Sequence, residues 1–129
     1  MIKFRAWDKR SGIYLYDVQN ASDMFSDVKY ENGENADCDE YCFAGFLYDE
    51  RYDVEQFTGL KDASGDEIYE NDLVLLDPDD PPYQVIFDEG KFELSNDYLR
   101  LVYDLSEEFM DCEIIGNVHK NPELLEDNE

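Results

Sequence analysis

Apolar and polar residues alternate in short runs along most of the chain, a pattern typical of β-strands with one face toward water. Residues 2–7 alternate apolar side chains with Lys3, Arg5 and Trp7, and residues 13–18 are rich in strand-forming types. The intervening residues 8–12, Asp-Lys-Arg-Ser-Gly, have turn chemistry. We therefore predict an N-terminal β-hairpin with one basic face.

The same pattern continues through the rest of the chain. Ser64-Gly65 and Glu89-Gly90 mark tight turns, and the proline-rich residues 78–82 form a stiff acidic loop. The strands that these signals separate are residues 52–60, 72–77, 83–95 as a hairpin, 98–105 and 113–118. Such short strands with regular turns predict a mainly β protein, a small barrel or sandwich.

Five further segments complete the prediction. Residues 22–28 resemble a short helical turn capped by Ser22, and Asn32-Gly33 is a hairpin signal. Residues 39–50 have a dense apolar centre, for which strand is favoured over helix. Residues 106–111 predict one helical turn that Ser106 caps, with acids in its first positions. Residues 121–129 predict a terminal turn and a charged tail.

The net charge changes this picture most. The chain has 129 residues, 34 acids and 10 Lys or Arg, for a formal charge of −24. A high charge alone favours disorder, but 15% aromatic residues indicate a folded domain with a negative surface. Such a surface repels nucleic acid and anionic membranes and attracts basic protein surfaces. One hypothesis is that the protein occupies a basic groove made for DNA or RNA; the alternative is that the acids serve solubility.

Eleven acids form the predicted partner-binding set, because they cluster in three regions and several alternate as one strand face requires. They are Asp37, Asp39, Asp53, Glu55, Asp77, Asp79, Asp80, Asp104, Glu107, Glu108 and Asp111. Four of the ten bases lie in residues 1–10. That basic face either pairs with nearby carboxylates or supports self-association.

No catalytic motif stands out. The sequence shows no nucleophile elbow and no glycine-rich phosphate loop, and it has one histidine, so we predict a non-enzymatic protein without a cofactor. Residues 62–73 miss the glycine and the final carboxylate of a calcium loop, which favours a turn around Gly65. Cys38, Cys42, Cys112 and His119 are a possible zinc set, but buried packing cysteines are favoured.

The first ten residues do not resemble a signal peptide, and no apolar run approaches the roughly 20 residues of a membrane span. We expect a cytoplasmic protein with reduced cysteines.

Three segments resemble the YopX family of phage and prophage proteins. They are "MIKFRAWDKRSGIYLYDV", "QFTGLKDASGDEIYENDLV" and "LSEEFMDCEIIGNVHKNPELL". The second is similar to a signature of the form TGLKDxxGxxIYxxDxV, and the third to EIIGN followed by NPELL. This chain has Glu70-Asn71-Asp72 where relatives often have Glu-Gly-Asp. Asparagine tolerates positive φ, so the turn is expected to survive.

The resemblance implies a YopX-like domain over residues 1–129 and a phage or prophage gene of a Gram-positive or similar bacterium. We expect a β-rich part with the hairpin in residues 1–55, an SH3-like β-barrel in residues 56–122 and an acidic tail in residues 123–129. The resemblance implies no reaction and no catalytic residue. Combined with the charge, it favours an accessory protein that inhibits a host nucleic-acid-binding or defence protein, as anti-CRISPR proteins do. The alternatives are a structural or regulatory phage module and a Cys/His metal protein.

Overall fold

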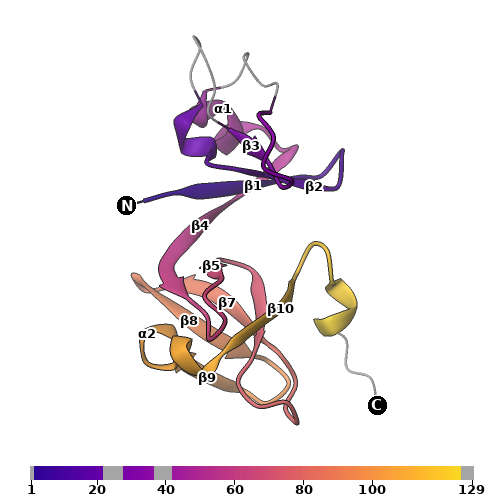
Figure 1. The fold of residues 1–129 in the computed structure, drawn as a ribbon. Coiled ribbons are helices and arrows are strands. Elements are labelled where there is room, and N and C mark those ends of the chain that lie inside the picture. The colour runs from indigo at the N-terminus through magenta and orange to yellow at the C-terminus, as the bar shows by residue number, and fades with distance from the viewer. Residues whose placement is uncertain (1, 22–27, 37–41, 126–129) are drawn as a thin grey trace. The chain divides into compact units, whose positions relative to one another are not determined.

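The computed structural model describes residues 2–21, 28–36 and 42–125. The chain divides into two compact units, Met1–Gln56 (unit 1) and Phe57–Glu129 (unit 2). Both are built mainly from antiparallel strands with a few short helices (Figure 1), so the predicted mainly β class is confirmed. No helix in these described ranges is long and apolar enough to cross a membrane.

Unit 1 is organised around the predicted hairpin. β1 (Phe4–Asp8) pairs antiparallel with β2 (Ile13–Tyr16), which confirms the hairpin. On the far side of β2 lies β3 (Lys29–Tyr30), and on the far side of β1 lies β4 (Tyr52–Lys61) through its first five residues. The sheet order in this unit is therefore β3-β2-β1-β4.

One face of this sheet forms the core of unit 1, which α1 (Phe43–Tyr48) and the 3₁₀ turn η1 (Val18–Asn20) complete. The phenyl rings of α1 reach the strands, since Phe46 packs 4.8 Å from Tyr52 and Phe43 packs 5.0 Å from Phe4. The buried members of this core are Ala6, Leu15, Val18, Ala21, Val28, Ala36, Phe46 and Tyr52.

The strand predicted for residues 39–50 is therefore wrong where the structure describes it. Phe43 and Phe46 are three residues apart, so a helix turns both rings toward the same core. The Asn32-Gly33 turn is confirmed, because the Gly33 N–H donates to the Tyr30 carbonyl at 2.9 Å and Gly33 has a φ of +90°. The helical turn predicted for residues 22–28 lies outside the described residues except for its end.

Unit 2 contains a five-stranded antiparallel sheet in the order β10-β6-β7-β8-β9. Its strands are β6 (Asp72–Leu75), β7 (Tyr83–Asp88), β8 (Lys91–Asn96), β9 (Leu101–Asp104) and β10 (Glu113–Asn117). The β7–β8 hairpin turns at Glu89 and Gly90, both with positive φ, as that turn type requires. In addition, the second half of β4 pairs with β5 (Glu67–Tyr69).

The core of unit 2 lies on one face of this sheet and includes Ile68, Val74, Tyr83, Val85, Leu94, Leu105 and Cys112. Among the described residues, β9 pairs with β8 alone and β10 pairs with β6 alone. The sheet thus has two open edges, and closure into an SH3-like barrel is not confirmed and stays a prediction.

The helical elements of unit 2 are α2 (Leu105–Glu108) and two 3₁₀ turns, η2 (Phe109–Asp111) and η3 (Pro122–Leu125). The predicted cap of α2 was two residues off. Asp104, not Ser106, is the cap, because its carboxylate accepts the Ser106 N–H at 2.9 Å. Glu107 and Glu108 do lie in the first turn, where acids complement the helix dipole.

Candidate functional site

The acid-rich stretch between β4 and β6 is a turn built around one buried carboxylate. Oδ1 of Asp62 accepts the N–H groups of Ser64 at 3.0 Å and Asp66 at 2.9 Å. Its Oδ2 accepts the Ile114 N–H of β10 at 2.9 Å. Gly65 has a φ of +89°, which only glycine adopts without strain. The predicted turn is confirmed, and both oxygens of Asp62 are engaged by backbone N–H groups.

The next turn of the same stretch is also structural. Asn71 has a φ of +69°, so asparagine does hold this positive-φ position of the turn, as predicted. Its side-chain oxygen accepts a hydrogen bond from the Gln84 amide at 3.0 Å, and Asp72 accepts the Tyr69 N–H at 2.8 Å. These carboxylate and amide groups fix the entry into β6.

The polar side chains of the third family-like segment, at the end of β10, also hold a turn. The side-chain oxygen of Asn117 accepts the N–H groups of His119 and Lys120, at 3.0 and 2.9 Å. The side-chain oxygen of Asn121 accepts the Asn117 N–H at 3.2 Å. The residues that carry the family resemblance therefore shape turns and strand ends.

The cysteines do not assemble into a centre in the described residues. Cys42 is exposed, and Cys38 lies outside the described residues. Cys112 is buried in the core of unit 2, where its thiol donates to the Phe109 carbonyl at 3.3 Å. Burial raises the pKa of this thiol to about 11, which keeps it protonated and unreactive at neutral pH. Within the described ranges no three His, Cys, Asp or Glu side chains are grouped to hold a metal.

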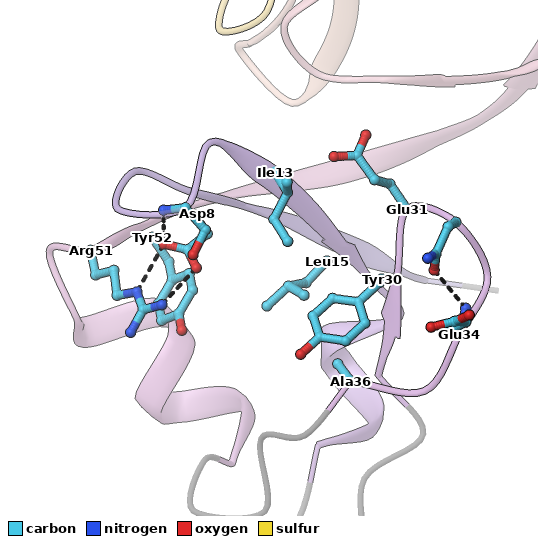
Figure 2. A pocket seen from close by; sticks show the side chains of 11 residues that line it. Asp8, Ile13, Leu15, Tyr30, Glu31, Glu34, Ala36, Arg51 and Tyr52 are labelled. Atoms are coloured by element: carbon cyan, nitrogen blue, oxygen red, sulfur yellow. Dashed lines mark hydrogen bonds and ion pairs between the residues drawn. The ribbon is translucent and has the colours of Figure 1, made fainter.

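A pocket of about 480 Å³ opens in unit 1 (Figure 2). Ile13, Leu15, Tyr30 and Ala36 form an apolar middle between two polar ends. At one end lie Asp8 and Arg51, and at the other lie Glu31 and Glu34. Sequence reasoning missed this pocket, because the contributing residues come from four segments that only the fold brings together.

The Asp8–Arg51 pair closes one end of the pocket with a two-pronged ion pair. Arg51 donates through Nε to Oδ1 of Asp8 at 2.8 Å and through an Nη to Oδ2 at 2.7 Å. Burial by itself would raise the pKa of Asp8, but these bonds and the N–H groups of Ser11 and Arg10 lower it to about 2. Since Arg51 is neutralised by its partner, the two glutamates leave the pocket lining negative.

In unit 1 the predicted partner-binding acids are not one exposed set. Glu55 is 1% exposed and hydrogen-bonds Arg5, so its place on an acidic surface was predicted wrongly. Its neighbour on the same strand face, Asp53, is partly exposed and lies 3.3 Å from Lys9. The basic face of β1 is thus used to pair with carboxylates. Asp37 and Asp39 lie outside the described residues.

In unit 2 the predicted acids are on the outside. Asp77, Asp79 and Asp80 are exposed in the loop that precedes β7, and this loop is held by its own turn. Oδ1 of Asp77 accepts the Asp79 N–H at 2.9 Å, and the Asp77 carbonyl accepts the Asp80 N–H at 3.0 Å. Their carboxylates are therefore presented on an ordered backbone.

The second acidic segment of unit 2 follows β9. Glu107 and Asp111 are exposed, and Glu108 is partly so. Asp104 differs, because its carboxylate caps α2 and lies 3.8 Å from Lys91. Hydrogen bonds from the Ser106 hydroxyl and N–H lower the pKa of Asp104. We call Asp77, Asp79, Asp80, Glu107, Glu108 and Asp111 the acidic surface.

One carboxylate from each segment of the acidic surface, Asp80 and Glu108, influences the pKa of Tyr83. The pKa of Tyr83 is raised, first by burial and then by Tyr103, and the charges of Asp80 and Glu108 both add to this effect. Charges influence a phenol in this way only at short range. Asp80 of the loop before β7 and Glu108 of α2 thus both lie within electrostatic reach of Tyr83, which sequence alone did not establish.

The geometry defines an antiparallel β protein whose signature polar residues hold turns and whose predicted partner-binding acids are exposed mainly in unit 2. The chain belongs to the YopX family, since the family described as YopX protein matches residues 3–126. A crystal structure of protein EF1440 from Enterococcus faecalis is similar, with 27% identity and a TM-score of 0.63 over 98% of this chain and 99% of that one.

Protein yopX from Bacillus subtilis is similar in fold, with 18% identity and a TM-score of 0.54 over 98% of both chains. A search of curated proteins finds no match to this chain.

Proposed function

We propose that the protein is a non-enzymatic phage or prophage accessory protein that binds a basic surface of a host protein. The observation that carries this proposal is the acidic surface itself, whose carboxylates are exposed or partly exposed in an ordered loop before β7 and in α2 and η2. The charge is also concentrated in the same unit, because residues 57–129 contain 21 acids and four Lys or Arg, a formal −17. Such a field attracts basic partners and speeds their association.

A nucleic-acid-binding or defence protein of the host fits this chemistry. B-DNA carries one charge per roughly 1.7 Å of axis, whereas same-face residues of one strand repeat at roughly 6.7 Å. One strand is therefore too sparse to imitate a duplex, and charges from several segments must converge. The acidic surface takes its exposed carboxylates from two segments of unit 2, the loop before β7 and the turns after β9, which supports that requirement. The protein would act as an acidic inhibitor in the cytoplasm of the bacterial host.

Two alternatives remain distinguishable from this proposal. If the acids serve solubility alone, in a structural or regulatory phage module, no partner will depend on them. If the protein is a Cys/His metal protein, purified protein will contain stoichiometric zinc. Cys112 packs in the apolar core of unit 2 as a small hydrophobic residue would, which speaks against the second alternative.

The test is a pull-down from bacterial host lysate with the wild-type protein as bait, at about 50 mM and about 500 mM NaCl. The matched bait carries Asp77→Lys, Asp79→Lys and Asp80→Lys together. We expect a basic host protein that is retained by the wild type at low salt and is released at high salt or lost by the variant. A partner that both baits retain equally at both salt concentrations would overturn the proposal.

A further inference from the structure

The edge strand β9 combines exposure with apolar side chains. Leu101, Val102 and Tyr103 are 39%, 56% and 37% exposed, although they lie in a regular strand. Among the described residues β9 pairs only with β8, so its other edge presents backbone groups that no strand covers. Exposed apolar edge strands are sites where a further strand can be added.

The register shows what an added strand would meet. Tyr103 is opposite Leu94, which is fully buried, so Tyr103 lies on the core side of the sheet. Its ring packs 5.7 Å from that of Tyr83. The apolar core face therefore continues out to the edge, and a strand beside β9 would extend it with its own apolar side chains.

The surroundings of β9 are acidic. Asp97 precedes the strand and is exposed, and Glu107 follows it. The nearby bases are Arg100, which is exposed, and Lys91, which lies 3.6 Å from Glu93 and 3.8 Å from Asp104. A segment that pairs with β9 thus enters a field of net negative charge, to which Asp80 and Glu108 near Tyr83 contribute.

We propose that β9 binds an extended segment of a basic partner by strand addition. The segment would alternate apolar side chains, which continue the core face, with Lys or Arg, which face the acids. A second copy of this chain is the less suitable occupant, because each copy carries a formal −24 and self-pairing would bring like charges together. This inference rests on the proposed function and names the mode of binding.

The experiment uses a fluorescent, end-blocked octapeptide of alternating Lys and Val as the probe, with fluorescence anisotropy at low salt as the readout. The control peptide has the same sequence with every backbone nitrogen methylated, which keeps its side-chain charge but removes the N–H donors of both strand edges. We expect the methylated peptide to bind roughly tenfold more weakly or worse. We also expect amide exchange at residues 101–104 to slow only with the unmodified peptide.

The protein variant is Val102→Asp, and the matched control is Met110→Asp, at a position that is 72% exposed and outside any strand. Both changes add one negative charge, which by itself favours a basic peptide. We expect Val102→Asp to weaken binding by roughly tenfold, because aspartate disfavours a strand, while Met110→Asp leaves binding within about twofold.

The outcomes separate the mode of binding from the proposed function. If both peptides bind equally well and only the triple lysine variant weakens them, strand addition is wrong and acidic binding stands. If neither peptide binds the wild type at low salt, both strand addition and binding through the acidic surface are wrong. If sedimentation shows a dimer of the wild type that Val102→Asp dissociates, the occupant is a second copy and the proposal is overturned.

Discussion

Nε of Arg5 lies 2.8 Å from Oε1 of Glu55, and both side chains are buried. The Tyr14 hydroxyl donates to the same carboxylate oxygen at 3.0 Å, and the Arg5 guanidinium stacks over the Tyr14 ring at 4.2 Å. Three strands, β1, β2 and β4, are therefore joined by one buried polar cluster. An acid that resembled part of a binding surface holds the sheet of unit 1 together.

Glu55→Gln is expected to lower the free energy of unfolding by about 3 kcal/mol, because it removes the negative charge with which the buried Arg5 guanidinium pairs. Asp53→Asn is the matched control, since Asp53 lies on the same strand face and pairs with Lys9 at a partly exposed site. The control is expected to cost about 0.5 kcal/mol or less. Urea unfolding of both variants is the measurement, and equal losses would contradict this account.

Asp62→Ala is expected to lower the free energy of unfolding by about 3 kcal/mol, because three backbone N–H groups lose their acceptor at a buried site. Asp66→Ala, four residues along the same turn, removes an exposed side chain and is expected to change stability by less than about 0.5 kcal/mol. Thermal unfolding in calcium-free buffer and with added calcium checks the prediction. Stabilisation by calcium that depends on Asp62 would show a metal loop instead.

The Asp8–Arg51 pair is expected to make stability depend on pH in the acid range. The pKa of Asp8 is about 2 in the folded protein and 3.8 unperturbed, so its stabilisation is complete above about pH 4 and is lost as the pH falls through about 2. The shift corresponds to about 2 kcal/mol. We expect the free energy of unfolding of the wild type, measured by urea unfolding, to exceed that of Asp8→Asn by this amount at neutral pH. The difference between the two proteins is expected to shrink below about pH 4. A difference that is constant from neutral to acid pH would refute the ion pair as its source.

Gly116→Ala is expected to destabilise the end of β10 by about 1–3 kcal/mol, because an added methyl group would overlap the Asn121 side chain. Asn121→Ala removes the two closest obstructing atoms, Oδ1 and Cγ, and with Oδ1 the acceptor of the Asn117 N–H. The double variant is therefore expected to be more stable than the sum of the two losses predicts. A double-mutant cycle by chemical unfolding measures this coupling, and strict additivity would exclude the steric account.

The triple variant with Asp77, Asp79 and Asp80 changed to Lys is expected to fold as the wild type does. All three positions are exposed, and only one side-chain bond within the loop, from the Asp79 N–H to Asp77, is at risk. Its melting temperature is expected to equal or exceed that of the wild type, since the change relieves self-repulsion in a unit of formal charge −17. A marked fall in melting temperature would mean that the loop is structural.

The sequence by itself determined the β class, the positions of most turns and the family. Turn chemistry is local: Gly65, Asn71 and Gly90 adopt positive φ because of what glycine and asparagine permit, whatever surrounds them. Strand periodicity is local in the same way, so both hairpins were found from the alternation together with the turn residues between the strands. By contrast, the Ile114 N–H donates to Asp62, which is 52 residues away in the sequence, and no local pattern predicts such a hydrogen bond.

Only the tertiary structure decided which acids are buried and which are presented. Asp53 and Glu55 share one strand face, yet Glu55 is buried because Arg5 and Tyr14 arrive from other strands. The apolar run at residues 43–48 became α1 because Phe43 and Phe46 find Phe4 and Tyr52 to pack against. Burial, pairing and helix choice depend on partners that are distant in sequence. A periodic pattern shows which side chains share one face of a strand or helix, whereas the tertiary fold determines which residues that face contacts.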